Sequence, residues 1–145
     1  MRHATSLALL AALVTLGSAC ARRDPGAPVS ATARTDAPGS VDTLRLAAGQ
    51  LGSVDDGRLT IEFVRITADS RCPSTAICVW MGDAAAELRL AAGGERRTDT
   101  VHTNLEPRRA SHGGYDVALA HVEPYPDGRE IAPAAYVAVL EVTRR

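Results

Sequence analysis

The sequence has no lysine, few aromatic residues and only three cysteines, and each scarcity excludes a class of function. All 16 basic residues other than histidine are arginine in this chain of 145 residues, which excludes a Schiff-base enzyme that uses lysine. One Trp, three Tyr and one Phe leave few rings on which bases could stack. The sequence also contains 17 acidic residues, so its formal net charge is -1. This charge balance does not indicate a basic surface for binding nucleic acid. We therefore expect no nucleic-acid partner.

No apolar run in the sequence reaches the roughly 20 residues that a membrane-spanning helix needs. The first residues instead have the order of a secretory signal. Met1-Arg2-His3 carries positive charge, residues 7–16 form an apolar run with two small interruptions, and Gly17-Ser18-Ala19-Cys20 supplies small residues that end in cysteine. This order resembles the signal of a bacterial lipoprotein, in which the cysteine is acylated and becomes the mature N-terminus. The resemblance implies a leader over residues 1–19 and a lipid on Cys20.

One position departs from the usual lipoprotein signal, which has Leu, Val or Ile three residues before the cysteine. That position is Gly17 here, and Gly17 with Ala19 also fits the site of an ordinary signal peptidase. Secretion as a soluble protein is therefore the alternative. The number of cysteines favours lipidation. If Cys20 is acylated, the two remaining cysteines, Cys72 and Cys78, can pair with each other in an oxidising compartment and no free thiol is left.

The expected location is the cell envelope, with the lipid as the membrane anchor. Ala21 follows the cysteine, and an Asp there would resemble an inner-membrane retention signal. We therefore expect the outer membrane, facing the periplasm. Residues 21–40 are rich in Pro, Gly, Ala, Ser and Thr and cannot bury enough apolar surface to offset the entropy of ordering. With Cys20 they form a predicted tether over residues 20–40, which would span roughly 25 Å as a flexible coil.

From residue 41 onward, apolar residues recur with the period of two that is typical of half-buried strands. A phase shift at residues 64–66 predicts a bulge, residues 98–103 are polar enough for an edge strand, and residues 136–140 are apolar on both faces, as in a central strand. The expected strands are residues 43–46, 59–66, 84–90, 98–103, 115–119 and 136–140, with turns at 55–57, 93–94, 111–114 and 124–128. A helix over residues 84–92 is the competing interpretation, but glycines bound a run of strand length.

These patterns predict an all-β protein with one domain over residues 41–145. The expected architecture is a single antiparallel β-sandwich, and an immunoglobulin-like sandwich or a small closed barrel are its variants.

The densest group of unusual residues is the segment 69–82, which contains Cys72 and Cys78. Their spacing, with Pro73 after the first cysteine, suits a disulfide that closes the connection between two strands and stabilises the fold by about 2 kcal/mol. The spacing is too wide for a thioredoxin-like redox motif or a zinc knuckle, and no second cysteine pair is present. Redox chemistry and metal binding are the alternatives to a structural disulfide.

The neighbours of the two cysteines are expected to hold this loop in place. Asp69 and Ser70 can bond to nearby backbone N–H groups, and Arg71 is expected to pair with Asp69 or Asp83. Trp80 is expected to bury its ring against the disulfide or the core. The alternative for Trp80 is a role in ligand binding.

Asp69-Ser70-Arg71-Cys72-Pro73, followed by Cys78, Trp80 and Gly82, resembles a family of bacterial exported proteins and lipoproteins with the pattern DSRCP, a short gap and C-x-W-x-G. The resemblance continues through His121-Val122-Glu123-Pro124-Tyr125-Pro126, Ile131-Ala132-Pro133 and Tyr136-Val137-Ala138, and so covers most of residues 41–142. The family brings no established activity and no catalytic residues to this chain. Asp69, Arg71, Pro73, Trp80 and Gly82 are therefore read as a structural motif.

The sequence is compatible with two functions from different classes. The sequence has no Gly-x-Ser-x-Gly motif and no phosphate-binding glycine loop, and Asp55-Asp56 precede a glycine as in a turn. The first function is a non-catalytic module that uses loops at one end, including residues 69–82, to bind a protein or other ligand of the cell envelope. The alternative is a small metal-binding or hydrolytic envelope protein that uses His102, His112 and His121. The sequence favours the binding module and predicts no cofactor.

Overall fold

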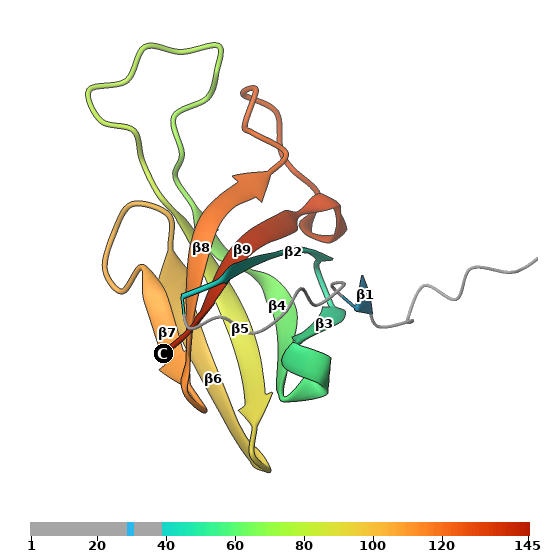
Figure 1. The fold of residues 1–145 in the computed structure, drawn as a ribbon. Coiled ribbons are helices and arrows are strands. Elements are labelled where there is room, and N and C mark those ends of the chain that lie inside the picture. The colour runs from blue at the N-terminus through green and yellow to red at the C-terminus, as the bar shows by residue number, and fades with distance from the viewer. Residues whose placement is uncertain (1–28, 31–38) are drawn as a thin grey trace, which may run out of the picture.

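The computed structural model describes residues 29–30 and 39–145, which form two β-sheets packed against each other (Figure 1). The predicted leader, Cys20 and the rest of the tether other than residues 29–30, 39 and 40 lie outside the described residues. Within the described ranges no helix is both long and apolar enough to cross a bilayer. The prediction of an all-β protein built as an antiparallel sandwich is confirmed.

The first sheet is an antiparallel meander of strands that follow one another in the chain. Its strands, in order across the sheet, are β3 (Gln50–Val54), β4 (Leu59–Asp69), β5 (Ala84–Ala92) and β6 (Glu95–His102). The two-residue β1 (Val29–Ser30) pairs in parallel with the free edge of β3. A 3-10 turn, η1 (Asp55–Gly57), connects β3 to β4.

The second sheet brings the first long strand of the domain beside the last one. Its strands, in order, are β2 (Val41–Ala47), β9 (Val137–Arg144), β8 (Tyr115–Glu123) and β7 (Arg109–His112), and every neighbouring pair is antiparallel. A short 3-10 turn, η2 (Pro133–Ala135), precedes β9.

The sequence located six of the eight antiparallel strands and missed the two shortest, β3 and β7. The predicted bulge in β4 is confirmed by a register shift between Phe63 and Arg65. β6 lies at a sheet edge and β9 between two strands, as expected. The turn predicted at residues 111–114 is wrong in its first half, because Ser111 and His112 belong to β7 and pair with β8.

The core lies between the two sheets. It is built from the inward-facing residues, which alternate along each strand with residues that face outward. On β4, Leu59, Ile61 and Phe63 are fully buried, and Leu88 and Leu90 of β5 lie beside them. The opposite layer is provided by residues of β2, β8 and β9, among them Leu46, Val117, Leu140 and Val142. Every residue of this core lies between positions 44 and 142. The core residues of the described domain therefore all follow the predicted leader in the chain.

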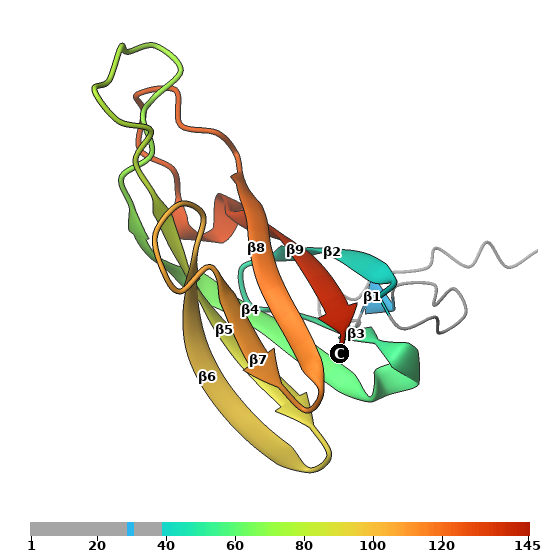
Figure 2. The same ribbon diagram turned by 60° about the vertical axis from the view of Figure 1, so that its left-hand side comes forward.

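Three loops leave the sandwich at the same end, which is called the loop end from here on. They are residues 70–83 between β4 and β5, residues 103–108 between β6 and β7, and residues 124–136 between β8 and β9. The first and third extend furthest beyond the sheets (Figure 2). The register pairs Val41 with Thr143 and Ala47 with Val137, so β2 begins at the opposite end, near the C-terminus.

Candidate functional site

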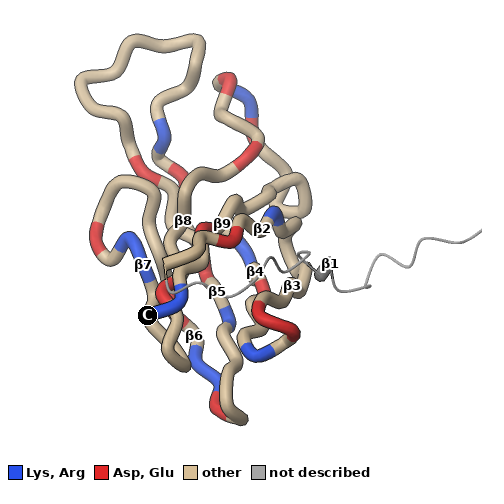
Figure 3. Tube along the Cα trace, in the orientation of Figure 1, with Lys and Arg blue, Asp and Glu red and all other residues tan. Residues whose placement is uncertain are grey.

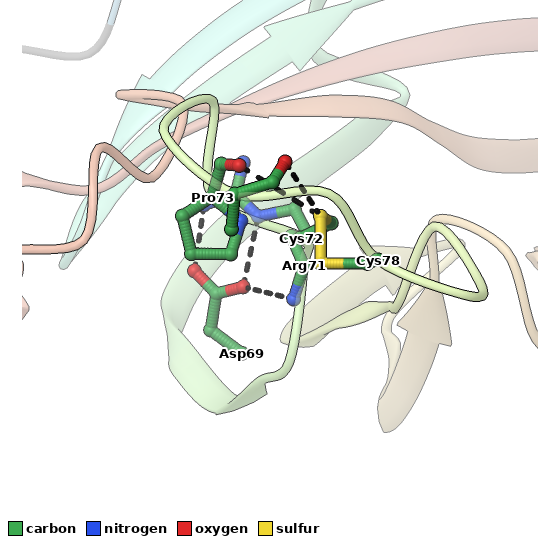
Figure 4. Close-up of a disulfide and its surroundings, with 6 residues drawn as sticks. Asp69, Arg71, Cys72, Pro73 and Cys78 are labelled. Carbon is green, nitrogen blue, oxygen red and sulfur yellow. Dashed lines mark hydrogen bonds and ion pairs between the residues drawn. A yellow bond between two sulfur atoms is a disulfide. The ribbon is translucent and has the colours of Figure 1, made fainter.

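The longest loop at the loop end is closed by the predicted disulfide between Cys72 and Cys78 (Figure 4). The Cys72 N–H donates to the Met81 carbonyl at 2.9 Å and so closes the base of the loop. Two further bonds attach this loop to residues 124–136: Ser74 N donates to Pro126 O at 2.9 Å, and Thr75 Oγ1 donates to Asp127 O at 3.1 Å. The two most extended loops are therefore joined to each other as well as to the sheets.

A buried arginine holds the base of these two loops. Arg71, only 8% exposed, donates through Nε and Nη2 to the two carboxylate oxygens of Asp69 at 2.9 and 2.6 Å. The same guanidinium donates to the backbone oxygens of Val122 and Pro124 at the end of β8. Of the two partners expected for Arg71, the structure selects Asp69. The Arg71 guanidinium also lies 5.6 Å from the centre of the Tyr125 ring.

The Asp69 carboxylate is the charged centre of this contact. Its Oδ1 accepts from the Arg71 backbone N–H at 3.1 Å, and its Oδ2 accepts from the Tyr136 hydroxyl at 3.2 Å. Burial raises the pKa of Asp69, but the hydrogen bonds and charge of Arg71 outweigh burial and leave the pKa below its ordinary value. Asp69 therefore stays ionised, and burial and Asp69 together raise the pKa of Tyr136.

A buried carboxylate, Asp83, attaches the loop of residues 103–108 to the same end. Its Oδ1 accepts from the backbone N–H of Asn104 at 2.8 Å and from Thr103 Oγ1 at 3.1 Å. Its Oδ2 lies 2.6 Å from His102 Nδ1. Burial raises the pKa of Asp83, but these hydrogen bonds outweigh it and leave the pKa below its ordinary value. Sequence reasoning missed this role, because the partners of Asp83 lie about 20 residues further along the chain.

The lowered pKa values of Asp69 and Asp83 predict a stability that falls in acid. Because their pKa is lower in the folded state than in the unfolded state, the stability they contribute is complete well above about pH 4. It is lost as the pH falls through their folded-state pKa. We expect the urea midpoint of unfolding to decline below about pH 4 and Asp83→Asn to make that decline shallower. Asp127→Asn, at an exposed loop position, is the control; an equal acid slope in the parent and Asp83→Asn would contradict the prediction.

The outer part of the disulfide loop presents apolar side chains to water. Ile77 and Val79 are as exposed as in an isolated peptide, at 105% and 106%, and Met81 is 72% exposed. The prediction that Trp80 is buried is wrong, because its side chain is 58% exposed. The loop extends beyond both sheets, so the core offers no surface that could receive the ring (Figure 2).

The other two loops at the loop end also carry exposed apolar residues. Leu105 is 47% exposed and Tyr125 is 59% exposed. A groove of about 280 Å³ runs between the three loops and the end of β8. Its lining includes Arg71, Met81, Thr103, Asn104, Arg108, His121, Glu123 and Tyr125. The tip is therefore defined by six exposed residues: Ile77, Val79, Trp80, Met81, Leu105 and Tyr125.

Charge is absent from the outer loop and present at its base. Residues 72–82 contain no ionisable side chain other than the two disulfide-bonded cysteines. Figure 3 shows this loop as an uncoloured segment between charged residues. That uncharged run was a signal available in the sequence, and sequence reasoning did not use it to identify Ile77, Val79 and Met81.

The three histidines of the metal hypothesis have separate partners. His102 contacts Asp83, His112 Nε2 lies 3.2 Å from the Glu95 carbonyl, and His121 Nε2 lies 3.3 Å from Glu123. Within the described residues, no three His, Cys, Asp or Glu side chains are placed so as to hold a metal ion. The structure therefore does not bring His102, His112 and His121 together as a metal site.

Comparison with known proteins found no matching family model, curated protein or solved structure. The likeness to exported proteins with the DSRCP pattern therefore stays an expectation from the sequence. The loop end is interpreted from its own geometry and charge.

Proposed function

We propose that the protein is a non-catalytic binding module of the cell envelope, exported and anchored by a lipid on Cys20, and that its loop end contacts the ligand. The observation that carries this proposal is the clustering of exposed apolar side chains. Six of the eight large apolar residues that are exposed in the described domain belong to the tip. Single exposed apolar residues are ordinary on protein surfaces, but a contiguous group marks an interaction site.

The rigid base of the tip supports the same function. Loops that bind ligands are commonly held by a stable scaffold, which reduces the entropy lost on binding. Here the scaffold consists of the disulfide, the Arg71–Asp69 ion pair and the Asp83 hydrogen bonds. In the described part of the chain, no group of His, Cys, Asp and Glu side chains that could hold a metal ion supports the metal-binding alternative.

The ends of the domain also suit a tethered binding module. The chain enters β2 at Val41, and the loops lie at the far end of the same strands. An anchored domain would therefore present its loop end away from the point of attachment. The proposed tether of roughly 25 Å would leave that end free to reorient.

The test is site-specific photocrosslinking in intact cells with the full chain and its native leader. A crosslinker in place of Val79 is expected to give an adduct with protein or lipid, whereas one in place of Thr98, exposed on β6, is not. In the same cells, labelled palmitate is expected on the native chain and not on Cys20→Ser. Equal adducts at both positions, or none at Val79, would contradict the binding function; an unlabelled native chain would contradict the anchor.

A further inference from the structure

We propose that the tip inserts into the interfacial layer of an uncharged lipid bilayer. This inference rests on the proposed function, because it names the ligand of the same loop end. The proposed contact is peripheral and shallow.

The shape of the tip favours a bilayer over a folded protein partner. Ile77 and Val79 are exposed at 105% and 106%, which means that they project from the loop and pack against almost nothing. A protein interface reaches high packing density, so it would need a deep cavity that matches these projecting side chains. A bilayer has no fixed shape and closes around them. The convex outer loop is therefore suited to lipid.

The charge of the tip indicates which lipids it meets. Residues 72–82 bring no charge to the surface, and the charged residues that bound this run, Arg71 and Asp83, are buried and hydrogen-bonded. Insertion of this outer loop therefore requires no exposed charge to leave water. The uncharged tip also provides no attraction to anionic headgroups, so binding is expected to depend little on salt.

Two aromatic residues fit the depth of the contact. Trp80 and Tyr125 are 58% and 59% exposed and come from the two loops that are bonded to each other. Their ring types prefer the layer between lipid chains and water. Deep insertion is disfavoured, because an irregular loop would bring unpaired backbone groups into hydrocarbon. The expected position of Trp80 is near the headgroups.

The loop is held in this conformation before it binds. The disulfide, the Cys72–Met81 backbone bond and the Ser74–Pro126 backbone bond fix both sides of the segment. Little backbone entropy is left to lose when the side chains enter the bilayer. Reduction of the disulfide is therefore expected to weaken the interaction while the apolar side chains remain unchanged.

The experiment uses residues 20–145 with Cys20→Ser, which lack the leader and lipid but retain all core residues of the described domain. Trp80 is the only tryptophan and so reports on the tip alone. With phosphatidylcholine vesicles we expect a blue shift of its fluorescence, and stronger quenching by lipids brominated near the headgroup than by lipids brominated deep in the chains. Raising NaCl from about 0.1 to 0.5 M is expected to change the partition coefficient less than about twofold.

The variant Val79→Asp keeps the tryptophan and changes a fully exposed position, so folding should be unaffected. It is expected to lower the partition coefficient at least about tenfold, because an aspartate in the bilayer is costly. The matched control is Val41→Asp, which alters an exposed valine at the opposite end of the domain and should leave binding unchanged.

Three outcomes would overturn the inference: no fluorescence shift, equal losses in the two aspartate variants, or binding only to anionic vesicles in low salt. If the vesicle experiment fails while Val79 still crosslinks to a protein in cells, the lipid inference is wrong and the binding function stands. If the Val79 position gives no adduct in cells either, the binding function itself fails.

Discussion

Replacing Arg71 with methionine is expected to lower the free energy of unfolding by about 3–5 kcal/mol, the range for removing one partner of a buried ion pair. The change leaves the Asp69 carboxylate, which is 12% exposed, without its charged partner. It also removes the donors to the backbone oxygens of Val122 and Pro124. The measurement is urea unfolding at neutral pH, with the midpoint and slope of the transition compared between variant and parent.

Arg65→Met is the matched control for this loss. Arg65 also pairs with a carboxylate, Glu87, but its side chain is 63% exposed, and such surface pairs contribute about 0–1 kcal/mol. Arg71→Lys should recover only part of the loss, because one ammonium cannot reproduce the four contacts of the planar guanidinium. Equal losses for Arg71→Met and Arg65→Met would contradict a structural role of the buried pair.

Gly82→Ala is expected to destabilise the protein by roughly 2–5 kcal/mol and to disturb the base of the disulfide loop. Gly82 has a φ of +72°, which side chains rarely adopt, and an added Cβ would lie 1.9 Å from the Ser70 carbonyl oxygen. A backbone atom cannot move aside as a flexible side chain does, so β4 and β5 would have to separate where the loop begins. Thermal and urea unfolding measure the loss.

Gly94→Ala separates the two causes of this effect. Gly94 also has a positive φ, +84°, but nothing lies within 4 Å of its added Cβ. Its substitution should therefore cost only about 1 kcal/mol, the part due to the backbone conformation. The excess in Gly82→Ala measures the close contact with Ser70. If the two alanine variants are equally stable, the close approach at Gly82 is not a constraint on the fold.

The sequence predicted the fold well because strand periodicity is a local property. Apolar residues two apart in β4, β5 and β8 identified their buried faces, and the phase shift in β4 identified its bulge. β3 was not predicted from the sequence, because Gly52 and Ser53 have weak strand preference. The strand is stabilised by its pairing with β4. Strand pairing of that kind depends on the neighbouring strand and leaves no local pattern to recognise.

The candidate site was less predictable, because it depends on which segments meet. The Cys72–Cys78 disulfide could be predicted from spacing and parity alone. The role of Asp83 could not, since its partners come from a loop about 20 residues later in the chain. The sequence predicts that Trp80 buries its ring against the disulfide or the core, yet in the structure Trp80 is 58% exposed. A large ring is buried only if the fold provides a neighbour for it.

The position of β2 determines how the domain responds to mechanical load. Its seven residues pair with β9, and its first residue lies at the end opposite the loops. Ladder hydrogen bonds run perpendicular to the strands. A force applied between the segment that precedes β2 and a partner bound at the loops therefore acts along the strands and loads this ladder in shear. The hydrogen bonds between β2 and β9 then bear the force together instead of breaking one after another.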